Sequence, residues 1–169
     1  MKSLPPFILF AALAGLSACA KKPPPQLPPA PPETTGPTEP TGPVSGTIVP
    51  GSQADFVATV SSDRIFFDLD QSDVDAPDRA TLQSQAAWLA RYANVRVTIE
   101  GHCDERGTRE YNLALGERRA NATKNALAAL GISATRINTV SYGKERPDAT
   151  GSEEDAYARN RRAVTVTVG

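Results

Sequence analysis

The pattern of apolar and polar residues divides the chain from residue 52 onward into strands and helices. Four segments carry bulky apolar residues in a short run or at every second position, which is typical of β-strands. These predicted strands are 64–70 (RIFFDLD), 95–101 (VRVTIEG), 138–143 (NTVSYG) and 163–168 (AVTVTV). In the second of them, alternation places Val95, Val97 and Ile99 on the inward face.

Helices are predicted between these strands by capping residues and by apolar residues spaced three or four apart. Asp75 is suited to cap a helix that has Pro77 in its first turn and extends to about Tyr92. Three shorter helical segments are also expected, at 52–56 (SQADF), 133–137 (SATRI) and 152–160 (SEEDAYARN). In the helix that Asp75 caps, the core face is predicted to hold Leu82, Ala86 and Leu89.

A long helix is predicted from about Asn112 to Leu130, where Gly131 provides a left-handed cap. One arc of this helix carries small, apolar or weakly polar side chains and is expected to face the core. On the same helical wheel, Arg119 lies at the margin of this arc and Arg118 points toward water. We therefore expect Arg119 to line a cleft, or alternatively to form a structural ion pair at the edge of the core. The predicted arc comprises Leu113, Gly116, Ala120, Thr123, Leu127 and Leu130.

The alternation of strands and helices favours an α/β fold in which helices pack on one mixed β-sheet. We assign this fold to a single domain, residues 52–169, without internal repeats. Ser152 is expected to cap the last helix of this domain.

The N-terminus has the features of a secretory signal peptide. Lys2 supplies a positive charge, residues 7–16 form a short apolar stretch, and two small residues precede Cys19. The apolar stretch is about half of the roughly 20 residues that a spanning helix needs, so we expect no transmembrane helix in the mature protein. The signal peptide is assigned to residues 1–18.

Residues 19–51 are predicted to be a disordered, proline-rich tether. Between Lys21 and Pro50 the sequence is dominated by Pro, Thr and Gly and has no aromatic residue, so little apolar surface is available to offset the entropy of folding. A polyproline segment rises about 3.1 Å per residue, which allows a reach on the order of 90 Å. A proline-rich ligand for another protein is the alternative interpretation.

Charge and cysteine content limit the possible partners. The formal net charge is −1, so the chain has no bulk attraction for nucleic acid, and an anionic ligand must be held by individually placed residues. The chain has two cysteines, and if Cys19 is modified then Cys103 has no partner within the chain. We expect Cys103 to be a small packing residue, although a free thiol in an oxidising compartment also forms mixed disulfides.

The segment LSAC, residues 16–19, resembles the lipobox of bacterial lipoproteins. The resemblance implies that Cys19 becomes the first residue after cleavage, carries acyl chains and anchors the chain in a membrane. Ala20 rather than Asp follows the cysteine, which in such lipoproteins is similar to a sorting signal for the outer membrane. We therefore expect a lipid-anchored outer-membrane protein whose domain faces the periplasm.

Four motifs, GHCDERGTREYNLALGERRAN, IFFDLD, VSYGKERP and NRRAV, resemble the peptidoglycan-associated lipoproteins of the OmpA-like domain family. The resemblance covers residues 64–168 and implies an OmpA-like sandwich that binds the peptidoglycan stem peptide non-covalently through its meso-diaminopimelate. Cys103 departs from the family pattern, which usually has a small residue at that position.

By the same motif match, Asp104 pairs with the ligand ammonium and Arg119 holds a ligand carboxylate. Arginine suits this role because its planar guanidinium donates two parallel hydrogen bonds to a carboxylate. Leu69, Asp70 and Leu115 match further pocket positions of the family. The resemblance also implies partners in the Tol system, especially the periplasmic protein TolB, and a role in envelope integrity and cell division.

Two other classes of function are possible for these residues, an enzyme and a protein-interaction module. An enzyme would need a centre at residues 102–105, but adjacent side chains diverge and the chain's one histidine has no serine elbow to serve, so His102 is expected to hydrogen-bond locally. One His and one available Cys do not supply a closed zinc site, and no metal or cofactor is predicted. A protein-interaction module that uses the basic KER and NRR segments is the second alternative.

Overall fold

The computed structural model describes residues 48–168. The predicted signal peptide, the lipidated Cys19 and the tether up to residue 47 lie outside the described residues. None of the helices in residues 48–168 is both long and apolar enough to cross a membrane.

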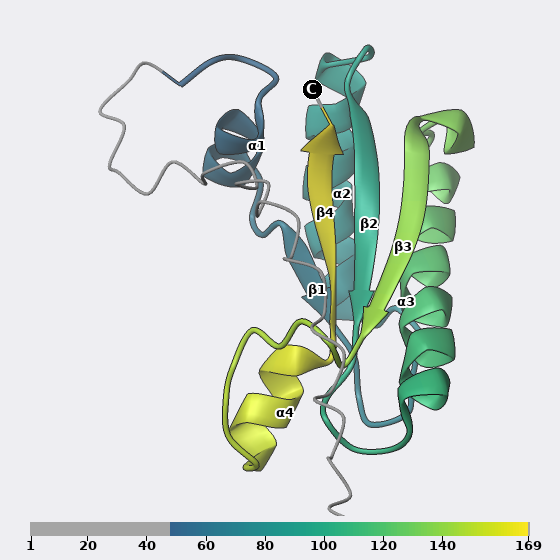
Figure 1. Cartoon of the computed structure of the whole chain (residues 1–169). Helices are drawn as coiled ribbons and strands as arrows, with labels where there is room; N and C mark the ends of the chain where they lie inside the picture. The colour runs from purple at the N-terminus through teal and green to yellow at the C-terminus, as the bar shows by residue number, and fades with distance from the viewer. Residues whose placement is uncertain (1–47, 169) are drawn as a thin grey trace, which may run out of the picture. The chain divides into compact units, whose positions relative to one another are not determined.

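One four-stranded sheet forms the centre of the fold (Figure 1). Its strands are β1 (Arg64–Phe66), β2 (Arg96–His102), β3 (Ile137–Gly143) and β4 (Arg162–Val168), in the order β1-β4-β2-β3. Strand β4 is antiparallel to both β1 and β2, whereas β2 and β3 are parallel. Strands β1, β2 and β3 therefore end at the same edge of the sheet, at the bottom of Figure 1.

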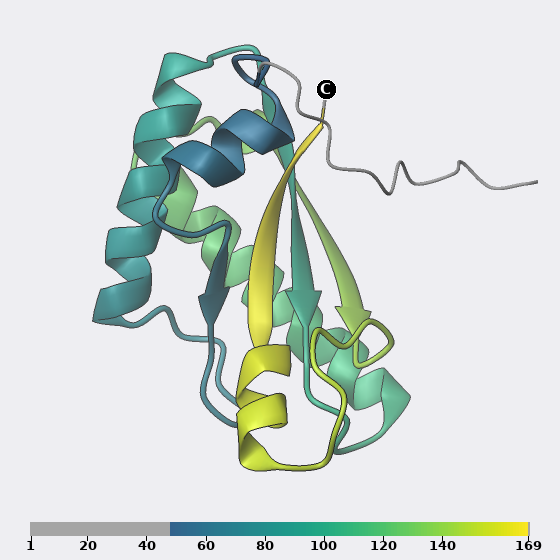
Figure 2. The same ribbon diagram turned by 90° about the vertical axis from the view of Figure 1, so that its left-hand side faces the viewer.

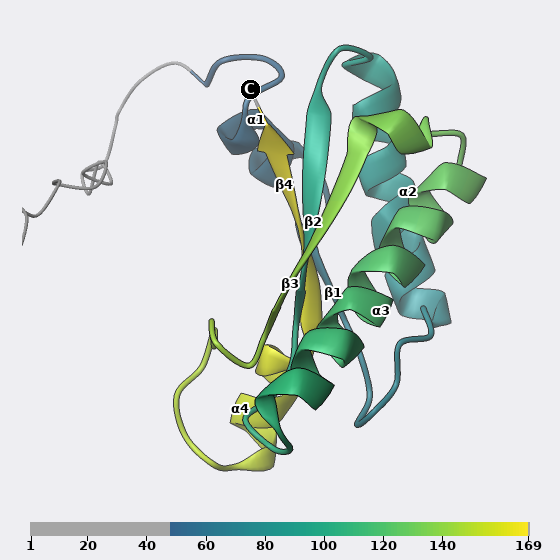
Figure 3. The ribbon, with the colours of Figure 1, turned by 45° about the vertical axis from the view of Figure 1, so that its right-hand side comes forward.

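Two long helices, α2 (Ala76–Arg91) and α3 (Arg109–Ala129), lie side by side on one face of the sheet (Figures 1 and 3). The short helix α1 (Gln53–Thr59) contacts β4 and α2 at one end of the sheet, and α4 (Glu154–Asn160) lies at the other end (Figure 2). A single 3-10 turn, η1 (Ala134–Arg136), precedes β3. The predicted α/β architecture, with helices packed on one mixed sheet, is confirmed.

The core lies between the sheet and these two helices, and it includes the residues that the apolar pattern selected there except Val95, which precedes β2 and is only partly buried. Val97, Ile99, Leu82 and Leu89 have no exposed surface, and Ala86 is 6% exposed. The remaining buried apolar residues of this cluster are Phe56, Val60, Ile65, Phe67, Trp88, Ala120, Leu127, Ile132, Ile137 and Ala163.

Two glycines bring α3 unusually close to the end of β2. A Cβ atom added to Gly101 would lie 1.9 Å from the Gly116 carbonyl oxygen, and one added to Gly116 would lie 2.4 Å from the Ser141 Oγ. Side chains at either position would push the helix away from the sheet. The close contact of these two glycines therefore determines how near the first half of α3 lies to the end of β2 and to the loop that follows it.

Several predicted boundaries differ from the structure. The first strand ends at Phe66 rather than Asp70, because the chain turns away there and Asp70 takes a left-handed backbone conformation with φ 57°. Helix α3 begins at Arg109, three residues earlier than predicted, because the Thr108 side chain accepts the Tyr111 N–H. The N-cap of α4 is Glu153 and not Ser152, whose hydroxyl donates to Glu105 instead.

The predicted buried arc of α3 is confirmed except at its C-terminal end. Gly116, Ala120, Thr123 and Leu127 are buried and Leu113 is half-buried, whereas Leu130, the C-cap residue, is 41% exposed. Arg118 is exposed, as predicted.

Candidate functional site

A cavity of about 320 Å³ lies at the edge of the sheet where β1 and β2 end. Its walls come from the loop after β1, the loop after β2, the first turns of α3 and the turn between α4 and β4. All five residues predicted to contact a ligand are among those that line it, so the fold brings them together. The lining residues are Leu69, Asp70, Cys103, Asp104, Arg106, Gly107, Tyr111, Asn112, Leu115, Arg119 and Arg161.

Asp104 is the carboxylate of this cavity, and it is held by two arginines. Its Oδ1 accepts hydrogen bonds from the Arg106 backbone N–H at 3.1 Å and from the Arg106 Nε at 3.2 Å. Its Oδ2 contacts the Arg106 Nη2 and, at 3.5 Å, the Arg161 Nη1. Burial by itself raises the pKa of Asp104, but the hydrogen bonds from Arg106 outweigh this effect and hold the pKa below its ordinary value. Asp104 is therefore ionised at neutral pH.

Arg161 is a buried cation that sequence reasoning did not identify. Its side chain is 8% exposed, its Nε donates to the Phe67 carbonyl at 3.0 Å, and its Nη1 lies 2.8 Å from a Glu154 carboxylate oxygen. The NRRAV motif contained this residue, but nothing in the pattern distinguishes Arg161 from Arg162. Only its position could have indicated this role, because Arg161 directly precedes β4, which begins beside the cavity.

Arg119 is fully buried, rather than at the margin of the core where the helical wheel placed it. Its guanidinium donates to three backbone carbonyls: from Nε to Gln71 at 2.8 Å, from Nη1 to His102 at 2.9 Å and from Nη2 to Asp68 at 3.0 Å. Arg119 does line a cavity, as predicted, but these acceptors are carbonyls and not carboxylates, so within residues 48–168 it forms no structural ion pair. A guanidinium has five N–H groups, and two of them remain beyond these three bonds.

The loop after β1 lines one side of the cavity, and Arg119 holds it in place by donating to the Gln71 and Asp68 carbonyls. Leu69 is half exposed, and the Asp70 Oδ1 accepts a hydrogen bond from the Tyr111 hydroxyl at 3.3 Å. Leu115, on the opposing wall, is 3% exposed. The predicted residues thus form a cavity with an acidic group, a basic group and an apolar wall.

A family model for the OmpA family matches residues 66–161 of the chain, a range that includes every predicted site residue of the domain. A peptidoglycan-associated lipoprotein of Agrobacterium fabrum is 55% identical over 125 residues, which cover 74% of this chain and 70% of that protein. The chain belongs to the OmpA family.

Other similar proteins extend the comparison within the OmpA family. A peptidoglycan-associated lipoprotein of Mesorhizobium japonicum is 42% identical over 165 residues, covering 98% of this chain and 92% of that protein. The crystal structure of the peptidoglycan-associated lipoprotein from Burkholderia pseudomallei superposes with a TM-score of 0.63 at 40% identity, covering 68% of this chain and 100% of that one. The OmpA-like fold expected from the motifs is confirmed.

The two residues that precede Asp104 in the sequence, His102 and Cys103, are buried in this OmpA-family domain. Cys103 is 2% exposed and its thiol donates to the Asn112 carbonyl at 3.3 Å, which confirms its packing role; burial raises the pKa of this thiol. The predicted local hydrogen bond of His102 is wrong, because neither ring nitrogen has a hydrogen-bond partner among residues 48–168; the Nε2 lies 3.6 Å from a Glu100 carboxylate oxygen. Burial and the charge of Arg162 lower the pKa of His102 to about 4. Within the same residues, no group of three or more His, Cys, Asp or Glu is arranged to hold a metal ion.

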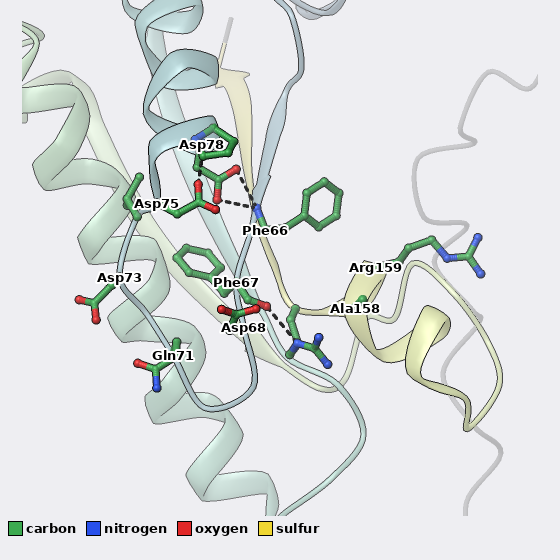
Figure 4. A pocket seen from close by; sticks show the side chains of 12 residues that line it. Phe66, Phe67, Asp68, Gln71, Asp73, Asp75, Asp78, Ala158 and Arg159 are labelled. Atoms are coloured by element: carbon green, nitrogen blue, oxygen red, sulfur yellow. Dashed lines mark hydrogen bonds between the residues drawn. The ribbon is translucent and has the colours of Figure 1, made fainter.

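A second, larger cavity of about 630 Å³ shares only Arg161 with the first. Figure 4 shows its acidic side, where the Asp78 carboxylate points at the backbone N–H of Phe66 and accepts from it at 3.3 Å and 3.4 Å. Burial raises the pKa of Asp78 to about 6. This carboxylate occupies a backbone donor of the edge strand β1 and so limits pairing with another chain.

Proposed function

We propose that this chain is an outer-membrane lipoprotein whose domain binds the peptidoglycan stem peptide non-covalently, through meso-diaminopimelate, with Asp104 and Arg119 as the charged contacts. The observation that carries the proposal is the gathering of all five motif-predicted residues around one cavity. Leu69, Asp70 and Leu115 contribute the rest of the contact surface.

The chemistry of the cavity matches a zwitterionic end group. The free end of a diaminopimelate side chain carries an ammonium and a carboxylate on the same carbon. Asp104 is ionised and attracts the ammonium, and the two N–H groups of Arg119 that carbonyls do not use are available for the carboxylate. Because Arg119 is fully buried, the ligand reaches it only when the covering loop, residues 68–71, shifts.

In the proposed function, lipidated Cys19 and the tether of residues 19–51 connect the outer membrane to the domain that binds the cell wall. The similar proteins from Agrobacterium and Mesorhizobium are named as lipoproteins, and the alignment with the second spans 165 residues and so includes most of the N-terminal segment. An acylated Cys19 would hold the chain in the outer membrane, and an extended tether would let the domain reach the cell wall.

We further propose that the domain works with the Tol system, with TolB as its main protein partner, in envelope integrity and cell division. This part of the proposal is supported by the family resemblance of the motifs and of the whole domain. A protein-interaction module that needs no wall ligand is the competing function, and a cell-wall hydrolase is a weaker one.

Incubation of the unlipidated mature chain, residues 20–169, with purified sacculi separates these functions. A wall-binding protein sediments with the sacculi and leaves them intact. Release of soluble fragments would identify a hydrolase, and a chain that remains in the supernatant would favour the interaction module and contradict the proposal.

A further inference from the structure

Arg106 contacts the carboxylate to which the proposed function assigns the ligand ammonium. Its Nε and Nη2 each contact a different oxygen of the carboxylate, a two-pronged arrangement that saturates the side of Asp104 that faces the cavity. Asp104 itself is only 5% exposed. A cationic ligand therefore meets a carboxylate that already has a cation.

The Arg106 side chain has other partners to hold it when it leaves Asp104. It is 38% exposed, its guanidinium carbon lies 4.3 Å from the centre of the Tyr157 ring, and its Nη1 is 3.7 Å from a Glu154 oxygen. Both partners are on α4, and Arg106 contacts them in addition to the Asp104 carboxylate. A small rotation of the guanidinium toward α4 keeps its charge compensated.

The backbone of Arg106 is held by hydrogen bonds that do not involve its side chain, which is partly exposed. The Arg106 N–H donates to Asp104 at 3.1 Å, and the Asn112 Nδ2 donates to the Arg106 carbonyl at 2.7 Å. Displacement of the side chain therefore leaves the loop after β2 in place. The second cation on Asp104, Arg161, has no such freedom, because it is buried and bonded to Phe67 and Glu154.

We propose that Arg106 is a displaceable internal cation that competes with the ligand ammonium for Asp104 and so sets the affinity and charge selectivity of the site. The inference rests on the proposed function, since it takes the ligand to be the diaminopimelate end group. A neutral ligand cannot compensate Asp104 when Arg106 leaves, whereas a cationic ligand replaces one positive charge with another. The ligand binds only those molecules in which Arg106 has left Asp104, so the apparent affinity equals the intrinsic affinity multiplied by the fraction of such molecules.

The test is calorimetric titration of the mature chain, residues 20–169, with a tripeptide of L-Ala, γ-D-Glu and meso-diaminopimelate. Arg106→Gln removes the competing charge and should bind about two- to fivefold more tightly, the range expected for a partly exposed ion pair. Arg106→Lys keeps a cation but contacts the carboxylate through a single ammonium, so its affinity should lie between those of the wild type and Arg106→Gln. Arg109→Gln is the matched control, because Arg109 carries the same charge three residues later, at the start of α3, pairs with Glu145 and does not line the cavity.

A double-variant comparison distinguishes competition from a change in the loop. In an Asp104→Asn background the carboxylate is absent, so adding Arg106→Gln should give no gain in affinity. Equal or weaker binding by Arg106→Gln in the wild-type background, with an unchanged thermal unfolding midpoint, would overturn this inference alone. Absence of binding by the wild-type chain and by every variant would overturn the proposed function, and this inference with it.

Discussion

Replacing Arg119 by alanine should destabilise the fold far more than replacing the adjacent Arg118. Arg119 is fully buried and satisfies three backbone carbonyls, of which the His102 carbonyl is in a buried environment and the Gln71 and Asp68 carbonyls are partly buried. A buried acceptor left without a donor costs about 1–3 kcal/mol, and the two partly buried ones regain some bonding to water, so we expect a loss of about 3–5 kcal/mol. Arg118 is exposed and makes only a distant contact with Tyr111, so its removal should change stability by less than about 0.5 kcal/mol.

Urea denaturation of the mature chain and of both variants, followed by circular dichroism near neutral pH, measures this difference. The two variants remove the same charge from neighbouring positions on one helix, so a change in net charge cancels between them. Equal losses for Arg118→Ala and Arg119→Ala would refute the structural role assigned to the three carbonyl bonds. The result also decides how binding data on Arg119 variants are interpreted, because an unfolded loop would abolish binding without a direct contact.

Three further predictions concern other parts of the chain. Gly101→Ala should cost about 3 kcal/mol or lower the yield of folded protein, because the new Cβ collides with the Gly116 carbonyl; a wild-type melting temperature would contradict this. His102 has a folded-state pKa of about 4, below its unfolded value, so it contributes stability above about pH 6.5 that is lost as the pH falls toward 4. His102→Phe should lack this loss, and parallel pH profiles of stability for the two proteins would contradict the assignment. Cys19→Ser should abolish incorporation of labelled palmitate and release the chain from the membrane fraction, and an acylated variant would rule out the lipid anchor.

Element types followed from the sequence where one physical signal was dominant. Asp75 caps α2 and its side chain accepts the Asp78 N–H, and alternation placed Val97 and Ile99 on the buried face of β2. The sequence-based predictions were wrong where a residue distant in sequence determines the hydrogen bonding of a side chain. Ser152 has the chemistry of a helix cap, but its hydroxyl is taken by Glu105, 47 residues away in sequence.

The candidate site shows the same division. The motif match selected Asp104 and Arg119, and both line the cavity. A helical wheel gives the direction of Arg119 but not the loop that lies over it, so its complete burial and its three carbonyl bonds were beyond that method. The roles of Arg106 and Arg161 were missed because their contacts with Asp104 depend on how the loop after β2 and the turn after α4 fold against each other.

The most direct test of the central claim, that Asp104 and Arg119 together recognise an ammonium and a carboxylate on one end group, compares two tripeptides. One ends in meso-diaminopimelate and the other in L-lysine, which has the ammonium but lacks the second carboxylate. Calorimetric titration of the mature wild-type chain should show at least about tenfold weaker binding of the lysine peptide, since loss of one charged partner in a desolvated pair costs on the order of 2–5 kcal/mol. Equal affinity for the two peptides would contradict the account.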